Sequence, residues 1–423
     1  MPVSPGRNPR LYFWRIIVRF KYICSDCQKE YITDKIMYQC PECSTLNDGT
    51  SFPKGNLIVK LDKEVLQKAK EKEHVTPNDF YPYPATDEKA YPIGVTPLMA
   101  PRRLQEETGV KNLYFKLDSQ LISGSFKDRA SYEVALQAKA LGEKKIALAS
   151  TGNAGAAMSA VGAAMGLDII LFVPASAPIN KLMQSVLYGA KVIPVKGTYD
   201  DAFKLSIEYT KLHGGINRNT AYNPMTIEGK KSISIELFEQ MGRKAPDAVY
   251  VPVGDGCIIA GVAKGFSDLL EAGLIDKMPK MICCQSTRSA AISNAVDNND
   301  YSEFDATTRA DSISVGLPAN GRMAAQYVKD SDGWTVRVSD EEILDSQIDL
   351  TSKAGVLAEP AAACAWAAFK KDKEHFVSTL GENAVAVVLL TGSGFKDMKA
   401  FDGRVSMPDA IENSVEEVKK LNF

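Results

Sequence analysis

The sequence predicts an α/β protein with two lobes, each built on a mostly parallel, twisted sheet flanked by helices, plus a small N-terminal cysteine module. From about residue 95 onward, short apolar runs bounded by Gly, Pro or Asp alternate with helical segments. Strands of a parallel sheet that is covered on both faces read as continuous apolar runs, so this alternation indicates parallel sheets. The pattern continues for about 300 residues, which is too long for one sheet of ordinary size and favours two lobes with a cleft between them.

The expected elements follow one another in a regular order. "AGAAMSAVGAAMG" at 154–166 predicts a helix of small residues, and its last residue, a glycine, ends the helix before the next apolar run. The predicted strands lie at 144–150, 168–174, 190–197, 248–256, 281–286 and 384–394.

The chain divides by composition into six segments. Residues 1–50 hold the cysteine module, and 51–95, rich in Pro, Tyr, Lys and Asp, are expected to form an extended arm around a larger body. We expect 96–130 and 246–405 to form a large lobe, 131–245 a small mobile lobe, and 406–423 a tail.

Bulk composition excludes several classes of partner. The net charge of -2 provides no basic field for nucleic acid or an anionic membrane surface, and no apolar run reaches transmembrane length. The basic N-terminal stretch is interrupted by Arg15 and Arg19, so it lacks the apolar core of a signal peptide, and its first ten residues are expected to be disordered. We therefore expect a cytoplasmic protein.

Four of the eight cysteines form a metal-binding pattern. Two CxxC pairs, separated by twelve residues, supply Cys24, Cys27, Cys40 and Cys43. Four thiolates in two knuckles suit a tetrahedral structural zinc, which could fold a module too small to bury its own core. A module that has lost its metal, or a pair of disulfides, is the alternative. The other cysteines, Cys257, Cys283, Cys284 and Cys364, have apolar or Gly-rich surroundings and indicate small buried side chains.

Three Gly-rich turns follow predicted strands: "ASTGNAGAA" at 149–157, "PVGDGCIIAG" at 252–261 and "LLTGSGFKD" at 389–397. The first two open a helix, and backbone N–H groups at a helix N-terminus bind anions. Neither matches the G-x-G-x-x-G dinucleotide fingerprint. Each can also be an ordinary tight turn, which any α/β protein needs.

Lys127 lies in "SGSFKDRA" at 123–130, a polar turn that is expected to open a helix. The three histidines fall outside the Gly-rich turns, which argues against Ser–His–Asp or Cys–His catalysis. A lysine or a cofactor is then the acid–base candidate, although an ordinary surface lysine would look the same.

These motifs, in this order, resemble the pyridoxal-phosphate enzymes of the tryptophan synthase β-subunit type, and within them most closely the threonine synthase family. "YNPMTIEGKKSISIEL" at 222–237 and "LAEPAAACAW" at 357–366 support the resemblance, which covers about residues 20–400. The cysteine module also resembles a ribbon found on some threonine synthases. The resemblance implies a PLP-dependent lyase that forms L-threonine and phosphate from O-phospho-L-homoserine and water, with a homodimeric assembly.

The resemblance also implies roles for individual residues. Lys127 would bind the cofactor covalently and then move protons, and Thr391 would face the pyridine nitrogen. The remaining cofactor-binding residues would be Phe126, Asn153, Gly254, Asp255, Gly256, Cys257 and Ile258, and the substrate-binding residues Ser150, Thr151, Gly152, Ala154, Thr226 and Asp255.

Three positions depart from the family pattern. Thr226 stands where an arginine is frequent, Asp255 where an asparagine is usual, and Ser393 where a histidine is common. The first two changes weaken affinity for an anionic leaving group. Positive charge from Arg218, Lys230, Lys231 or Arg322 could compensate.

Other functions therefore stay open. One is β-elimination or β-replacement on an amino acid without phosphate, of the serine/threonine dehydratase or diaminopropionate ammonia-lyase type, which Asp255 favours. Another is a replacement reaction like that of cysteate synthase. A non-enzymatic zinc-ribbon interaction protein with a lapsed active site is the alternative from a different class.

Overall fold

The computed structural model describes residues 19–89, 91 and 93–421 of the chain. Within them the protein has an α/β fold with three sheets, of which one is parallel, one mixed and one antiparallel. The N-terminal stretch that was predicted to be disordered lies outside the described residues.

The largest sheet has six strands in the order β12-β11-β10-β13-β5-β4. The first five are parallel, and β4 pairs antiparallel with β5 at one edge. The strands are β4 (Leu98–Met99), β5 (Leu113–Lys116), β10 (Ala248–Pro252), β11 (Lys280–Ser286), β12 (Thr335–Val338) and β13 (Ala386–Leu389).

The second sheet has four parallel strands in the order β8-β7-β6-β9. They are β6 (Lys145–Ala149), β7 (Asp168–Pro174), β8 (Lys191–Val195) and β9 (Ile216–Asn217). The six strands predicted from apolar runs are thereby confirmed as β6, β7, β8, β10, β11 and β13. The sequence did not reveal β4, β5, β9 and β12, because strands of two to four residues are too short to show a period. β13 is equally short, but it lies within the longer apolar run at 384–394 and was therefore found.

The third sheet is small and antiparallel, with β1 (Phe20–Cys24) between β2 (Glu30–Tyr31) and β3 (Leu57–Leu61). Residues 51–95 are expected to form an extended arm, but part of this segment is the strand β3, which pairs with β1 of the cysteine module. Two helices, α1 (Lys63–Lys70) and α2 (Pro77–Phe80), follow β3. The alternation in "LIVKL" buries one face of β3, which is why this part of the segment folds as a strand.

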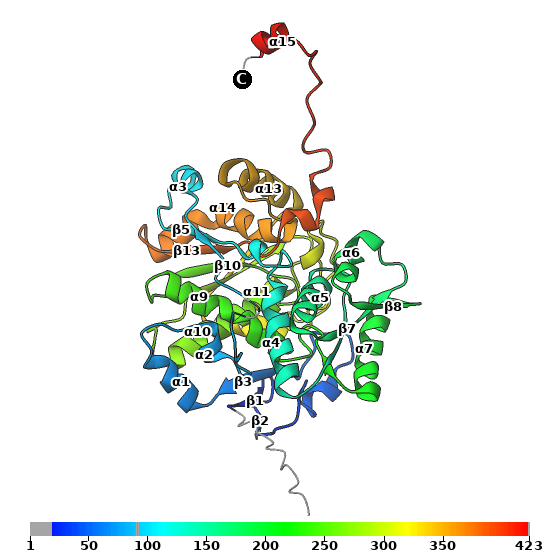
Figure 1. Cartoon of the computed structure of the whole chain (residues 1–423). Coiled ribbons are helices and arrows are strands. Elements are labelled where there is room, and N and C mark those ends of the chain that lie inside the picture. The colour runs from blue at the N-terminus through cyan, green and yellow to red at the C-terminus, as the bar shows by residue number, and fades with distance from the viewer. Residues whose placement is uncertain (1–18, 90, 92, 422–423) are drawn as a thin grey trace, which may run out of the picture.

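Helices cover the two large sheets (Figure 1). The figure shows β7 and β8 with α6 and α7 on one side of the molecule, and β5, β10 and β13 beside α13 and α14 on the other. The predicted helix at 154–166 is confirmed as α5. The remaining helices are α3 (Arg102–Thr108), α4 (Lys127–Ala140), α5 (Asn153–Met165), α6 (Ile179–Leu187), α7 (Tyr199–His213), α8 (Met225–Lys230), α9 (Ser232–Gln240), α10 (Cys257–Glu271), α11 (Ala291–Asn298), α12 (Gly321–Asp330), α13 (Asp340–Ala354), α14 (Pro360–Leu380) and α15 (Val415–Lys420).

The core has two main parts. One lies against α14, whose alanines and Trp366 pack on the six-stranded sheet, and the other runs through α4, α9 and α10 to the N-terminal sheet. The four cysteines that were predicted to be small buried side chains are buried. Among the described helices, none is long and apolar enough to span a membrane.

Candidate active site

A cavity of about 730 Å³ lies where the carboxyl ends of β6, β10 and β13 meet. Ligands of parallel α/β sheets bind at this end of the strands, because the loops there carry free helix N-termini. The turn 150–154 after β6, the turn 254–258 after β10, Lys127 and Thr391 all line the cavity. The structure thus brings the three Gly-rich turns and the lysine together.

Lys127 is the first residue of α4, and the loop before it is attached to the turn after β13. Phe126 N donates to Thr391 O at 2.8 Å, and Ser393 N donates to Gly124 O at 2.9 Å. Ser125 and Gly392 form an isolated antiparallel bridge between the same two segments. Lys127 and Thr391 are therefore held at one end of the cavity by backbone hydrogen bonds.

The environment of Lys127 favours an uncharged amine. Burial lowers its pKa, and the positive charge of Arg218 acts in the same direction, whereas the acids Glu359 and Asp255 oppose this effect. A lysine that loses its proton more readily than usual is a better nucleophile. This is the physical state that a covalent role for Lys127 requires.

The turn 150–154 leads directly into α5, which begins at Asn153. Ser150 Oγ accepts from Gly152 N at 3.2 Å and from Gly155 N at 3.0 Å, which holds the turn closed. Because Ala156 N is the first to bond within the helix, to Gly152 O, the N–H groups of Asn153 and Ala154 stay available at the cavity. They form half of an anion-binding surface.

The turn 254–258 supplies the other half. Gly256 precedes α10 with φ of 84°, a left-handed conformation that favours glycine. A Cβ at Gly256 would lie 2.7 Å from Ala324 Cβ, and one at Gly254 would lie 2.9 Å from Ile313 Cα. The turn therefore presents bare backbone to the cavity at the N-terminus of a 15-residue helix.

Asp255, Cys257 and Ile258 line the same turn. The Asp255 carboxyl accepts from Ala319 N at 3.3 Å, and burial raises its pKa. Burial also raises the pKa of the Cys257 thiol to about 12, so this thiol stays protonated at neutral pH.

Two of the four compensating cations lie at the cavity. Lys230 lines it, and among the described residues its Nζ donates only to Thr226 O, at 3.0 Å. Arg218 lies behind the lining residue Thr220, to whose hydroxyl its Nη1 donates at 2.7 Å, and its buried Nη2 has no partner among the described residues. Burial lowers the pKa of Lys230 to about 7 and that of Arg218 to about 10.

The other two cations have different partners. Lys231 is buried between Glu228 and Asp268, with salt bridges of 2.5 and 2.8 Å. Arg322 donates to Phe52 O and lies over the ring of Tyr301, outside the cavity lining. Neither is available to a ligand in the cavity.

Two predicted site residues are not part of the lining. Thr226 is fully buried, and its hydroxyl donates to Asn223 O at 2.8 Å. Phe126 is also fully buried, directly before Lys127. Their predicted contacts with substrate and cofactor stay predictions.

Sequence reasoning missed several residues of the site. Glu359 is 2% exposed, and both of its carboxylate oxygens accept from Asn153 Nδ2, at 3.0 and 3.3 Å. A charged residue within the apolar run "LAEPAAACAW" was the available signal, because acids are rarely buried without a purpose. Glu359 thus contacts the lining residue Asn153, whereas Tyr199 and the segment 311–317 line the cavity themselves, and the irregular sequence of that segment has no recognisable pattern.

The four cysteines of the N-terminal module form a second cluster. Their sulfur atoms all lie within 4.8 Å of one another, and Cys27 Sγ is 3.9 Å from Cys40 Sγ. All four are free thiols, so the alternative of two disulfides does not hold in this structure.

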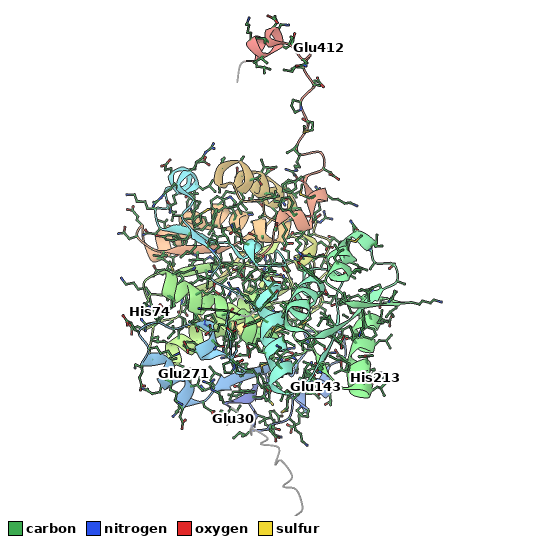
Figure 2. All side chains as sticks on the ribbon, viewed as in Figure 1. Glu30, His74, Glu143, His213, Glu271 and Glu412 are labelled. Carbon is green, nitrogen blue, oxygen red and sulfur yellow. The ribbon has the colours of Figure 1, made fainter. Side chains whose placement is uncertain are left out.

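The histidines are absent from both clusters. Figure 2 labels His74 and His213 at the periphery of the molecule, and all three histidines are exposed. No histidine among the described residues lines the large cavity. This agrees with the argument against histidine-based catalysis.

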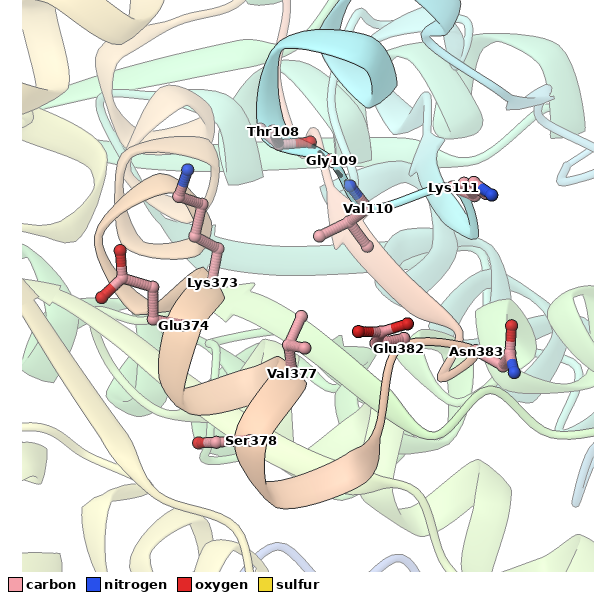
Figure 3. A pocket seen from close by; sticks show the side chains of 10 residues that line it. All are labelled: Thr108, Gly109, Val110, Lys111, Lys373, Glu374, Val377, Ser378, Glu382 and Asn383. Carbon is pink, nitrogen blue, oxygen red and sulfur yellow. Dashed lines mark hydrogen bonds between the residues drawn. The ribbon is translucent and has the colours of Figure 1, made fainter.

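A separate groove of about 560 Å³ lies at the opposite, amino ends of β5 and β13 (Figure 3). Its charged lining residues are at the surface, and Lys373 and Glu374 lie on the α14 side, as the figure shows. It has none of the buried polar groups that mark the large cavity.

Comparisons with known proteins agree with this geometry. A family model described as "Pyridoxal-phosphate dependent enzyme" matches residues 89–392. Threonine synthase of Methanosarcina acetivorans is 30% identical over 414 residues, which cover 95% of this chain and 98% of the relative. Threonine synthase of Methanocaldococcus jannaschii is 33% identical over 408 residues, which cover 94% of this chain and 98% of the relative.

Solved structures are similar at the level of the fold. Threonine deaminase isoform 2 from Solanum lycopersicum has a TM-score of 0.62 at 22% identity, over 73% of this chain and 87% of that one. Diaminopropionate ammonia lyase from Escherichia coli also has a TM-score of 0.62, at 18% identity and the same two coverages.

Proposed function

Because this chain belongs to the pyridoxal-phosphate-dependent enzymes and, among them, to the threonine synthase family, we propose that it converts O-phospho-L-homoserine and water to L-threonine and phosphate. The observation that carries the proposal is a pair of buried cations: Lys230 lines the cavity, and Arg218 is bonded to the lining residue Thr220. Neither forms a salt bridge with a carboxylate among the described residues, and burying unpaired charge is costly. A phosphate group of the substrate would compensate both.

The residues of the cavity fit pyridoxal phosphate. The bare backbone at Gly254 and Gly256 and the free N–H groups at the start of α10 suit its phosphate, and Lys127 has the lowered pKa that a covalent attachment needs. Asn153 would hold the 3' oxygen, and Thr391 would face the pyridine nitrogen. When bound, this cofactor withdraws electrons from the carbon that carries the substrate's amine.

The side chains of this chain would carry the remaining steps. The N–H groups of residues 151–154 would hold the substrate's α-carboxylate, and Lys127 Nζ would take protons from the substrate's α- and β-carbons and return them. Lys230 and Arg218 would stabilise phosphate as it leaves the γ-carbon, after which a water oxygen adds to the β-carbon. A hydroxyl at Thr391, unlike a carboxylate, does not keep the pyridine nitrogen protonated, which favours elimination and replacement over transamination.

The decisive experiment is a substrate panel. The purified protein with pyridoxal phosphate is given O-phosphohomoserine, serine, threonine and diaminopropionate, and phosphate, ammonia, 2-oxo acid and threonine are measured together. We expect phosphate and threonine in equal amounts from O-phosphohomoserine. Faster release of ammonia from an unphosphorylated amino acid would refute the proposal.

A second candidate function rests on the acids of the cavity. Asp255 lines it beside the lysines, and Asp200, Glu303 and Asp311 line it as well. These carboxylates favour a neutral or cationic side chain over a phosphate, as in β-elimination from serine, threonine or diaminopropionate. The same panel distinguishes the two functions.

We also propose a structural zinc on Cys24, Cys27, Cys40 and Cys43. Four ligands 2.3 Å from a tetrahedral zinc would be about 3.8 Å apart, close to the 3.9 Å between Cys27 Sγ and Cys40 Sγ. Metal analysis of the purified protein is expected to find one zinc per chain, and loss of that zinc in Cys40→Ser would identify the ligands.

The assembly and the division into lobes belong to the same proposal. We propose a cytoplasmic homodimer in which 131–245 form a small mobile lobe and 96–130 with 246–405 a large one. The separation of the four-stranded parallel sheet from the six-stranded mixed sheet supports this division, and eight cysteines without a disulfide support a reducing compartment. Light scattering coupled to size-exclusion chromatography tests the assembly.

A further inference from the structure

The buried acid Glu359 belongs to a segment that is hydrogen-bonded to the turn after β13, and that turn is bonded to the loop before Lys127. Glu359 N donates to Gly392 O at 3.0 Å, and Gly394 N donates to Leu357 O at 2.9 Å. Residues 357–359 therefore lie along the turn after β13, which is itself bonded to the loop before Lys127. This arrangement fixes Glu359 directly before α14 and links its segment, through the turn after β13, to the loop before Lys127.

The carboxyl group of Glu359 has a defined position. It packs on the bare backbone of Gly392, where a Cβ would collide with it. Both of its oxygens accept from Asn153 Nδ2, the side chain expected to face the cofactor. The acid thereby fixes the orientation of the Asn153 carboxamide at the start of α5.

The charged groups around this acid are few. Lys127 and Lys396 attract its negative charge, and Asp397 repels it. Lys127 in turn faces Glu359, Arg218, Asp255 and Cys257. Burial raises the pKa of Glu359 and lowers that of Lys127, while the charge of each group favours the ionised form of the other.

We propose that Glu359 is a positioning residue that holds the Asn153 carboxamide and whose negative charge keeps Lys127 able to retain a proton. Without this charge, the nearby cation Arg218 would leave the lysine amine deprotonated over a wider range of pH. A residue that must both take and return protons needs a balanced environment. Glu359 would provide that balance without touching the substrate.

The primary test measures the titration of Lys127 in the full-length protein without added cofactor. Lysines are methylated with formaldehyde and cyanoborohydride from pH 6 to 10, and the peptide that contains Lys127 is quantified by mass spectrometry. In Glu359→Gln we expect the midpoint of its reactivity to fall by about one pH unit or more, which is roughly a tenfold gain in rate at lower pH. An unchanged midpoint would overturn the inference.

Glu133→Gln is the matched control. Glu133 lies on the same helix as Lys127, is fully buried and has a raised pKa, but it is not among the groups that act on Lys127. Its replacement is expected to leave the Lys127 midpoint unchanged. An equal shift in both variants would mean that loss of any buried acid loosens α4, which contradicts a specific role for Glu359.

Gly392→Ala provides a second variant that keeps the charge. The new Cβ displaces the Glu359 carboxyl from its place, so we expect a fall in the Lys127 midpoint in the same direction, together with a changed visible absorbance of bound pyridoxal phosphate as Asn153 loses its anchor. Thermal unfolding shows whether each variant is folded, and if Glu359→Gln is not, Gly392→Ala carries the test. A folded Gly392→Ala with an unaltered midpoint and spectrum would contradict the inference.

The inference rests on the proposed function for its catalytic meaning, but its test does not depend on that function. If O-phosphohomoserine is not a substrate, the proposed function fails while the titration of Lys127 is unaffected. If the titration does not respond to Glu359→Gln, the inference fails even in a fully active threonine synthase.

Discussion

At the scale of single residues, the buried side chain of Lys230 lines the cavity and can bring positive charge to it. It lies one helical turn after Thr226, and its Nζ donates to the carbonyl oxygen of that residue. We propose that this cation takes the role of the arginine that is frequent at the position of Thr226, as one of the four compensating cations that the sequence offers.

We expect Lys230→Gln to impair the use of the phosphorylated substrate. Loss of a charge-assisted hydrogen bond costs about 2–3 kcal/mol, so kcat/KM for O-phosphohomoserine should fall roughly 30- to 150-fold. Steady-state kinetics measure this, with the exposed Lys204→Gln on α7 as the control. Equal kinetics in both variants would remove Lys230 from the phosphate site.

Lys230 also predicts a pH dependence. Its pKa is lowered to about 7, so in the free enzyme its positive charge is present below that pH and is lost above it. Because kcat/KM reports groups of the free enzyme, kcat/KM for the phosphorylated substrate should decline above about pH 7. The decline should be absent from Lys230→Gln, and its persistence there would assign it to another group.

At the scale of single elements, the start of α10 requires a glycine at position 256. In Gly256→Ala the left-handed φ and the collision with Ala324 act together, and we expect a loss of about 2–4 kcal/mol in the free energy of unfolding. Gly166→Ala has a similar φ but open space around its Cβ, so it should cost only about 1 kcal/mol. Fluorescence titration should show weaker binding of pyridoxal phosphate in the first variant only.

The cysteine module is connected to the same turn. Asn56, which is paired with Gln39 of the module, donates from its Nδ2 to Ala319 O at 2.8 Å and to Asn320 Oδ1 at 2.9 Å. Asn320 N in turn donates to Asp255 O at 3.0 Å. On another side, Tyr38 Oη accepts from Asn217 N, next to Arg218. The module thus supports both the anion-binding turn and the strand that leads to the buried arginine.

We therefore expect Asn56→Ala to weaken binding of pyridoxal phosphate by up to roughly 30-fold, since two hydrogen bonds of about 1 kcal/mol each are lost. Asn112→Ala, which removes an amide-to-carbonyl bond to Asn383 at the surface, is the control and should leave binding unchanged. The zinc content should be equal in both variants. Unaltered cofactor affinity in Asn56→Ala would show that the module is independent of the site.

At the scale of the whole molecule, a buried ion network joins distant parts of the chain. Arg129 of α4 binds Asp118 at 2.6 Å and Glu236 of α9 at 2.5 Å, and Lys116 of β5 binds Glu236 at 2.8 Å. All four side chains are buried. The network connects the helix of Lys127 with the six-stranded sheet and with α9.

Glu236 makes this network sensitive to acid. Its pKa is lowered from the usual 4.5 to about 2 by its two cationic partners, Arg129 before Lys116, despite burial. A lowered carboxyl pKa adds stability that is complete above pH 4.5 and is lost as pH falls toward 2. Urea unfolding should show that Glu236→Gln costs about 3–5 kcal/mol at pH 7 and much less at pH 3.

Glu133→Gln serves as the comparison for this loss as well. Burial raises the pKa of Glu133, so a neutral amide replaces a carboxyl group that already resists ionisation, and the cost at pH 7 should stay within about 1 kcal/mol. If Glu236→Gln cost no more than this, the network would not contribute to stability.

The motifs around the site were predictable because each is local. "SGSFKDRA", "STGNAG" and "VGDGC" are turns next to a strand or helix, and an anion-binding turn at the carboxyl end of a strand can be recognised from the strand and helix that flank it. That Lys127 lies beside two such turns was implied by the family resemblance, and the cavity brings them together from two different sheets. The six predicted strands followed from the apolar runs that contain them.

Tertiary structure alone decided which charges reach the cavity. Lys230 and Lys231 are adjacent in sequence, but successive residues of a helical turn point about 100° apart, so the first enters the cavity and the second enters a salt bridge with Asp268. Glu359 reaches Asn153 only because residues 357–359 pair with the turn after β13. Local patterns determine what each segment can offer, whereas packing between segments determines which of those groups are left without a partner.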